Sequence, residues 1–417
     1  VVHIRCFEIL KSVYSTIKEG IMKKVLNFRT ILAVLTILLT APMVSANPGV
    51  QKFHLGSPRP GDIYKEFTFN NRGLPNANWR VTDPGVDLTK HPGAADDIPN
   101  PILELSVSDL NGATYAELLI DMWAGHQGTT DKKFRVNGNP WIPLPEINQL
   151  GPCPSPGNMY FYQMNHLVRI PLNYLNAGTN RFQGSCGPNM WDWGQWGWYG
   201  LVLRIYYEPW KPHASGQITS PGSGSSFGEN PTIQVSTSGS VNRVHVLAYY
   251  DGYDTDGDGN YLDYHRNYHR ASWNELIGIK GHVGTDTSAP FSLTWNTAWV
   301  PNQAPGVIKL KAIIKDVNGY CYVTPEKSNL TLNRTNSSVR LYKPYGVSQV
   351  FGVRVGETKS CKVDVSTLSG ATAAVMHRPT WNGNPYGENM SNKVNGWTAP
   401  RYGMDHFYSY DEISVPI

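Results

Sequence analysis

A repeat with a constant offset is the feature that most constrains how this chain folds. Three separate anchors recur, each 258 positions after its first occurrence: Gly112-Ala113-Thr114 at Gly370-Ala371-Thr372, Trp123 at Trp381, and Asn137-Gly138 at Asn395-Gly396. Farther on, Ile170-Pro171-Leu172 matches Val415-Pro416-Ile417 after a gap of thirteen residues. Because chance matches seldom keep one offset across several anchors, we predict two copies of one module with a different segment between them.

The second copy is shorter than the first. The first continues after Pro171 through the strand-like residues 200–207, whereas the second ends one residue after Pro416. We therefore expect the C-terminal copy to lack its last strands and the chain to be a fragment of a longer polypeptide.

The N-terminal region carries the pattern of an export signal. Met22-Lys23-Lys24 is basic, residues 31–39 are almost all apolar, and Val44-Ser45-Ala46 is a small-residue cleavage pattern. The apolar run is short for a membrane span. We expect residues 1–21 to be upstream translation and residues 22–46 to be a signal peptide, which makes the protein secreted or displayed on the cell surface. The alternative is an uncleaved N-terminal anchor.

Export places the mature cysteines in an oxidising compartment. Cys6 belongs to the upstream segment, which leaves Cys153, Cys186, Cys321 and Cys361 and three ways to pair them. We predict a disulfide between Cys153 and Cys186, since both lie in one module and the bond would close a long loop. Cys321 with Cys361 would have to join two modules.

The composition indicates short strands and many turns. Among 417 residues there are 40 Gly, 30 Pro, 23 Tyr and 13 Trp, and only 16% of residues are charged. This balance is typical of all-β modules. The net charge of +4 is spread thinly, without a Lys/Arg cluster in the mature part, which argues against nucleic acid as a partner. We predict modules at 47–209, 210–337 and 338–417, with core strands of the first at 102–107, 116–123, 133–136, 166–170 and 201–207.

Two segments resemble known families. Residues 175–183, Leu-Asn-Ala-Gly-Thr-Asn-Arg-Phe-Gln, resemble a segment of the galactose-binding-like jelly rolls found in secreted carbohydrate-active proteins. The strand order expected over 210–337 resembles the bacterial Ig-like domains that separate other modules in exported proteins. The resemblance implies jelly-roll-like β-sandwich modules flanking an Ig-like β-sandwich, in a carbohydrate-binding protein.

An acidic stretch in the middle module has the spacing of a calcium loop. Asp254, Asp256 and Asp258 alternate and Gly259 stands sixth, while Asn260 and Asp263 follow. The twelfth position is His265 where a helical calcium loop has glutamate, and the flanking residues suit strands. We therefore predict a structural Ca²⁺ site on a hairpin, held by Asp254, Asp256, Asp258, Asn260 and Asp263. The alternative is a solvated acidic turn without an ion.

The densest aromatic run contains Trp191, Trp193, Trp196 and Trp198. Exposed indole rings stack on the apolar faces of sugars, so these four are candidate carbohydrate-binding residues. The equally open alternative is that they fill the core beside Cys186. Binding residues are also expected where the two copies differ, chiefly between Asn137 and Pro171, since segments that vary on a fixed scaffold commonly carry binding.

The sequence has no zinc-binding His-Glu-x-x-His pair and no phosphate loop. Glu117, Asp121 and Asp192 are carboxylates that a glycosidase could pair, but their separation is not set by the sequence. We predict a secreted accessory protein that binds a polysaccharide or other glycan and has no membrane span in its mature chain. The alternatives are a polysaccharide hydrolase or lyase with its site in the first β-sandwich, and a structural surface or adhesion protein.

Overall fold

The protein is an all-β chain, as its sequence predicts. The computed structural model describes residues 58–70, 79–123, 125, 128–145, 163–189, 193–253, 261–265, 283–335, 337–346, 353, 358–381, 383, 391–401, 403 and 408–417. Two short 3-10 helices, η1 (Pro92–Asp97) and η3 (Leu172–Tyr174), are the helical elements among them. The predicted signal peptide and upstream segment lie outside the described residues.

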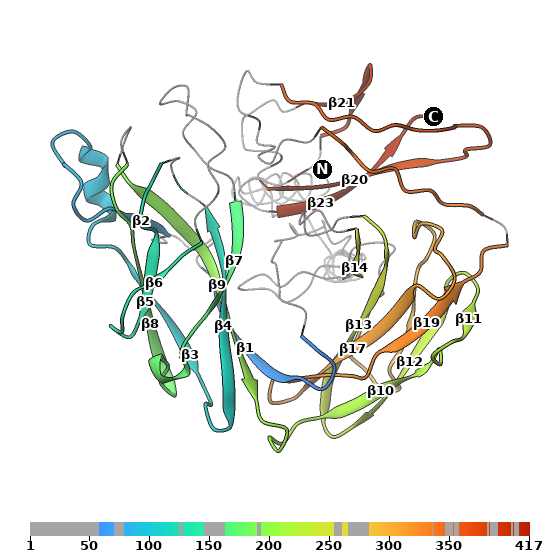
Figure 1. The fold of residues 1–417 in the computed structure, drawn as a ribbon, viewed down its shortest axis with the longest axis horizontal. Coiled ribbons are helices and arrows are strands. Elements are labelled where there is room, and N and C mark those ends of the chain that lie inside the picture. The colour runs from blue at the N-terminus through green and yellow to red at the C-terminus, as the bar shows by residue number, and fades with distance from the viewer. Residues whose placement is uncertain are drawn as a thin grey trace, which may run out of the picture. The chain divides into compact units, whose positions relative to one another are not determined.

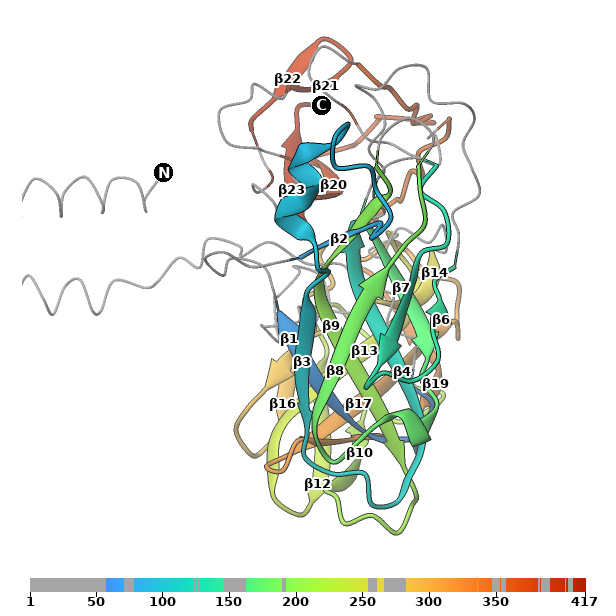
Figure 2. The same cartoon turned by 90° about the vertical axis from the view of Figure 1, so that its left-hand side faces the viewer.

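The first module is a sandwich of two sheets (Figures 1 and 2). One layer is the β1-β9-β4-β7 end, with β2 on β9, of a 12-stranded sheet that continues from β1 into β18, and the other is the separate sheet β3-β8-β5-β6. Their strands are β1 (Ile63–Asn70), β2 (Arg80–Thr82), β3 (Ile102–Val107), β4 (Ala113–Trp123), β5 (Lys133–Val136), β6 (Ile142–Pro143), β7 (Gln163–Arg169), β8 (Gly178–Ser185) and β9 (Gln195–Tyr207). All five predicted strands of this module are present.

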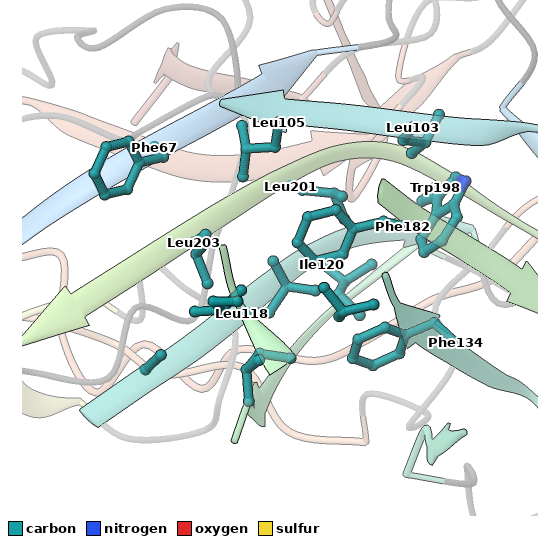
Figure 3. Packing of buried hydrophobic residues seen from close by; sticks show 14 of the residues in the cluster. Phe67, Leu103, Leu105, Leu118, Ile120, Phe134, Phe182, Trp198, Leu201 and Leu203 are labelled. Atoms are coloured by element: carbon teal, nitrogen blue, oxygen red, sulfur yellow. The ribbon is translucent and has the colours of Figure 1, made fainter. Parts of the chain in front are cut away.

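Alternation along the strands builds the core of this sandwich. On β3, Leu103, Leu105 and Val107 are buried while the residues between them are exposed, as expected where one face of a strand meets a second sheet. Figure 3 shows Leu103 and Leu105 on the side of the core opposite the facing sheet, whose core residues include Leu118, Ile120, Leu201 and Leu203. The other face of β3 is therefore exposed to solvent.

The middle module has a second core of its own. A three-stranded sheet β10-β12-β16 packs on a sheet that contains β13, β17 and β19. The strands are β10 (Ser215–Ser220), β11 (Ser226–Phe227), β12 (Thr232–Ser238), β13 (Val241–Asp251), β14 (Leu262–His265), β15 (Thr285–Asp286), β16 (Ser292–Thr294), β17 (Ile308–Asp316), β18 (Tyr320–Val323) and β19 (Lys327–Leu332).

Strand β1 joins the first two modules, a role that its sequence does not announce. One edge of β1 pairs with β9 and the other with β18, so Tyr64 lies between Tyr206 and Cys321. Asp109 reinforces this joint, since its carboxylate accepts hydrogen bonds from Lys211 at 2.5 Å and from Tyr320 at 2.6 Å. Burial acts to raise the pKa of Asp109, but these hydrogen bonds prevail and lower it to about 2.

The second copy reproduces the strand register of the first. Its strands are β20 (Ala374–Trp381), β21 (Asn392–Val394), β22 (Trp397–Ala399) and β23 (Tyr408–Val415). Trp123 lies opposite Gln163 in β4–β7, and Trp381 lies opposite Tyr408 in β20–β23. Those four positions are related by the offset of 258 and the gap of thirteen that the sequence shows, and every pair shared by the two hairpins keeps this relation.

The turns of the two copies agree in backbone conformation at two repeated positions but not at a third, since Gly138 has φ of 74° and Gly396 lies outside the left-handed region. Gly112 and Gly370 have φ of 77° and 73°, and Asn137 and Asn395 have φ of 52° and 51°. These are left-handed conformations that glycine and asparagine adopt most readily. The repeat of Gly112 and Asn137 is therefore explained by folding, as predicted for these two residues.

Candidate functional site

Two of the four tryptophans proposed as sugar-binding residues are core residues. Trp196 and Trp198 are fully buried on β9 and pack edge to face with ring centroids 5.0 Å apart. The Trp196 indole also donates to the Ser185 carbonyl at 3.0 Å. The prediction that these two rings stack on sugar is thus wrong, because both belong to the core cluster of the sandwich, on the part of β9 that pairs with β2 and β4. Trp193 is partly buried beside His91, and Trp191 lies outside the described residues.

The acidic stretch connects two paired strands. β13 ends at Asp251 and β14 begins at Leu262, and the two are antiparallel with Tyr250 opposite Asp263. The predicted hairpin is therefore confirmed. Asp254, Asp256, Asp258 and Asn260 lie outside the described residues, and within the part of the chain that is described no three potential ligands form a metal-binding group. The calcium site stays a prediction.

The predicted disulfide stays a prediction too. Cys186 is a buried thiol, and Cys153 lies outside the described residues. Burial raises the pKa of the Cys186 thiol, which keeps it protonated and unreactive. Cys361 is an exposed thiol, whereas Cys321 is buried in the joint between β1 and β18.

Two of the carboxylates considered for glycoside hydrolysis, Glu117 and Asp121, are buried. Glu117 is buried, and one of its oxygens accepts hydrogen bonds from Arg204 at 3.0 Å and Tyr206 at 2.9 Å. Arg204 also bridges to Glu66 at 2.9 Å, so one guanidinium links three strands. Burial disfavours the charged form of Arg204, yet the neighbouring carboxylate of Glu66 raises its pKa above the ordinary value. Asp121 is fully buried, and Asp192 lies outside the described residues.

An exposed tryptophan stands instead on the outer face of the β3-β8-β5-β6 sheet, which faces the viewer in Figure 2. Lys133 pairs with Pro143 and Phe134 with Ile142, so the next pair along β5 and β6 is Arg135 with Trp141. Across the sheet, Arg135 lies opposite Gln183 and Gln183 opposite Ile102. These four residues, which we name the Trp141 row, lie side by side across four strands: Trp141, Arg135, Gln183 and Ile102.

The Trp141 row combines an apolar ring with hydrogen-bonding groups. Trp141 is 37% exposed and Ile102 47%. The Arg135 guanidinium lies 4.7 Å from the Trp141 ring centroid and donates to the Gln183 side-chain oxygen from Nε at 3.0 Å and from Nη2 at 2.6 Å. With strands about 4.8 Å apart, the row is about 14 Å long. It is a preorganised, elongated surface, since each polar group is held by its neighbour.

A single extra residue brings Trp141 to this face. Asn139 closes the turn by donating its backbone N–H to Val136 at 2.9 Å, and regular pairing from there would place Trp141 opposite Phe134, whose side chain is in the core. Pro140 is the extra residue of a bulge, where the missing N–H of proline costs no ladder hydrogen bond. Trp141 falls within the segment predicted from the difference between the copies, but the ring itself was missed because a bulge leaves little trace in sequence.

Comparison with known proteins supports the middle module. Residues 215–312 match the bacterial Ig domain family, so the predicted Ig-like domain is confirmed there. No curated protein matches the chain. Among solved structures, a β-1,2-glucanase from Parabacteroides distasonis is 13% identical over 69% of this chain, with a TM-score of 0.17. The aligned part spans 40% of the glucanase, and a likeness this low supports neither a fold nor an activity.

The described residues include no helix that is both long and apolar enough to cross a membrane.

Proposed function

We propose that this chain is a secreted accessory protein that binds a polysaccharide through the outer face of the β3-β8-β5-β6 sheet. The observation that carries the proposal is the Trp141 row, an exposed indole beside an arginine and a glutamine. Indole rings bury the apolar C–H face of a sugar, and guanidinium and amide groups bond its hydroxyls. A flat sheet face open along its length suits a chain better than a small enclosed ligand.

The other modules fit an accessory role. In this proposal the Ig-like module is a spacer, and the jelly-roll-like first module displays the Trp141 row away from it. The joint built by β1 and Asp109 would hold that display rigid. The alternative of a hydrolase gains no support from Glu117, since its described hydrogen bonds serve the sheet.

We also propose that the loop between β13 and β14 binds a structural Ca²⁺. Three aspartates at alternating positions repel one another unless a cation offsets their charge. Adding calcium should slow hydrogen exchange in β13 and β14, and a chelator should reverse this. An Asp256→Asn variant should lose the response. If calcium does not change hydrogen exchange in β13 and β14 of the unaltered protein, the proposed site is refuted.

A glycan array tests the main proposal. The exported chain should bind one or more polysaccharides, and Trp141→Ala should weaken that binding by about tenfold, a loss expected for one aromatic anchor. Trp210→Ala is the matched control, because Trp210 is also exposed but packs on Gly112 far along the chain from the row. Equal losses in both variants, or no binding to any glycan, would contradict the proposal.

A further inference from the structure

We infer that the Trp141 row binds an acidic polysaccharide through the carboxylate of a uronic acid residue. The inference rests on the proposed function and names the class of its ligand. It follows from the charges on the outer face of β3-β8-β5-β6, where three cations lie on adjacent strands: Lys133, Arg135 and Arg181.

Two of these cations are already neutralised by carboxylates. Lys133 forms an ion pair with Asp131, and Arg181 forms one with Glu104 at 3.0 Å. Arg135 differs, because its contacts are the neutral Gln183 amide and the Trp141 ring. Within the described ranges no carboxylate lies at ion-pair distance from its guanidinium. The unpaired positive charge therefore lies beside the exposed ring.

The orientation of Arg135 suits a carboxylate. The two N–H groups that Gln183 engages come from Nε and Nη2, on one edge of the planar guanidinium. Both N–H groups of Nη1 and the second of Nη2 are left for a ligand. That edge matches the two oxygens of a carboxylate in a bidentate pair, which is stronger than a neutral hydrogen bond.

The position of the charge beside Trp141 also fits this ligand. A pyranose ring whose apolar face lies on exposed indole would carry its ring carboxylate at the ring's edge, toward Arg135 4.7 Å from the indole centroid. Ile102, at the far end of the row, adds apolar surface for a further sugar of the same chain. A neutral sugar would make the stacking contact but leave the Arg135 charge without a partner.

Affinity electrophoresis of the exported chain in gels containing polygalacturonate, dextran sulfate or dextran tests the inference. Polygalacturonate should retard the protein most, and Arg135→Gln should weaken that interaction by about tenfold, as expected for a lost charge-assisted pair. Arg181→Gln is the matched control: it removes an arginine of the same face that Glu104 already neutralises, and should change the affinity by less than about twofold. Unfolding curves would confirm that both variants fold.

Each of the other outcomes refutes either the inference alone or both the inference and the proposed function. Retention by dextran with no effect of Arg135→Gln refutes the acidic ligand and leaves the proposed function standing. Equal retention by dextran sulfate and polygalacturonate refutes the carboxylate specificity. Equal effects of Arg135→Gln and Arg181→Gln reduce the binding to general charge attraction and refute the site. If none of the three polymers is retained and a glycan array is also blank, both the inference and the proposed function fail.

Discussion

The hairpin β5–β6 of the first copy and the hairpin β21–β22 of the second turn at the same Asn-Gly pair but place their tryptophans on different faces. In the second copy Trp397 follows the turn directly and lies opposite Val394. The first-copy counterpart of Val394 is Val136, a core residue. Trp141 lies instead opposite Arg135, on the outer face.

Both hairpins carry a cation at the same repeat position, but in the first a tryptophan lies beside it and in the second a threonine lies opposite it. Lys393 occupies the repeat position of Arg135 and is exposed, and its cross-strand partner is Thr398. Since successive side chains on a strand point to opposite faces, moving one residue along the return strand changes which face the ring occupies. The two copies thus place their tryptophans on opposite faces of the same hairpin scaffold.

The hairpins β4–β7 and β20–β23 differ in the opposite way: they share one strand register, but the side chains at some matching positions differ in charge. Leu118 opposite Val168 in the first copy corresponds to Met376 opposite Ile413 in the second, so the apolar pair is kept. The next positions change: Arg378 and Asp411 form an ion pair at 2.9 Å where the first copy has Ile120 opposite His166.

The largest effect on stability is expected from a substitution in β9, a core strand of the first copy. Trp198→Ala should destabilise the first module by about 3 to 5 kcal/mol, since a large buried ring leaves a cavity. Hydrogen exchange in β20 and β23 of the second copy should not change. If Trp198→Ala left the first module as stable as before and lost glycan binding, the buried placement of this ring would be wrong.

The turn asparagines should differ in a smaller way. Asn137 donates to the Tyr174 carbonyl and to Asn180, and accepts from the Arg181 backbone at 2.8 Å. Asn137→Ala should therefore cost about 3 kcal/mol, from lost hydrogen bonds and a strained left-handed residue. Asn395 is exposed in its turn, so Asn395→Ala should cost about 1 kcal/mol. Urea unfolding of both variants checks the ratio, and equal costs would contradict it.

These comparisons show what the sequence could and could not predict. The offset predicted two copies of one module, and the matching registers of β4–β7 and β20–β23 agree with this. Local sequence predicted the strands of the first module, because apolar side chains and the turn residues between strands can be recognised without knowing the strand order. The role of β1 was missed, since nothing local to residues 63–70 indicates that both of its edges are paired. Burial of Trp196 and Trp198 depends on strand order, which local sequence does not contain.

A pH effect confined to the second copy should follow from His377. Its ring stacks on Tyr253 at 4.1 Å, and burial lowers its pKa to about 4. The folded state favours the neutral imidazole of His377. The free energy of unfolding is therefore highest above pH 6.5, the pKa of histidine in the unfolded chain, and falls as the pH drops toward 4. The loss should reach about 2 kcal/mol between pH 6.5 and pH 5.

Hydrogen exchange in β20 across this pH range measures the loss. His377→Leu, which restores the residue found at Leu119 in the first copy, should abolish it. A variant that kept the same pH dependence would assign the effect to another group.

The smallest expected effect is on glycan affinity, and it tests the comparison of the two hairpins most directly. The change gives the first hairpin the spacing between turn and tryptophan that the second hairpin has. Deleting both Asn139 and Pro140 would make Trp141 follow Gly138 directly, as Trp397 follows Gly396. Its ring would then lie opposite Val136, and glycan binding should fall by about tenfold, or about 1.4 kcal/mol. Deleting Pro140 alone removes only the bulge and leaves Trp141 opposite Arg135, so binding should stay within about threefold. Titration of both variants with the glycan that the unaltered chain binds separates the two cases. Equal affinities would show that the face occupied by Trp141 does not determine binding, and the contrast between the hairpins would then concern folding alone.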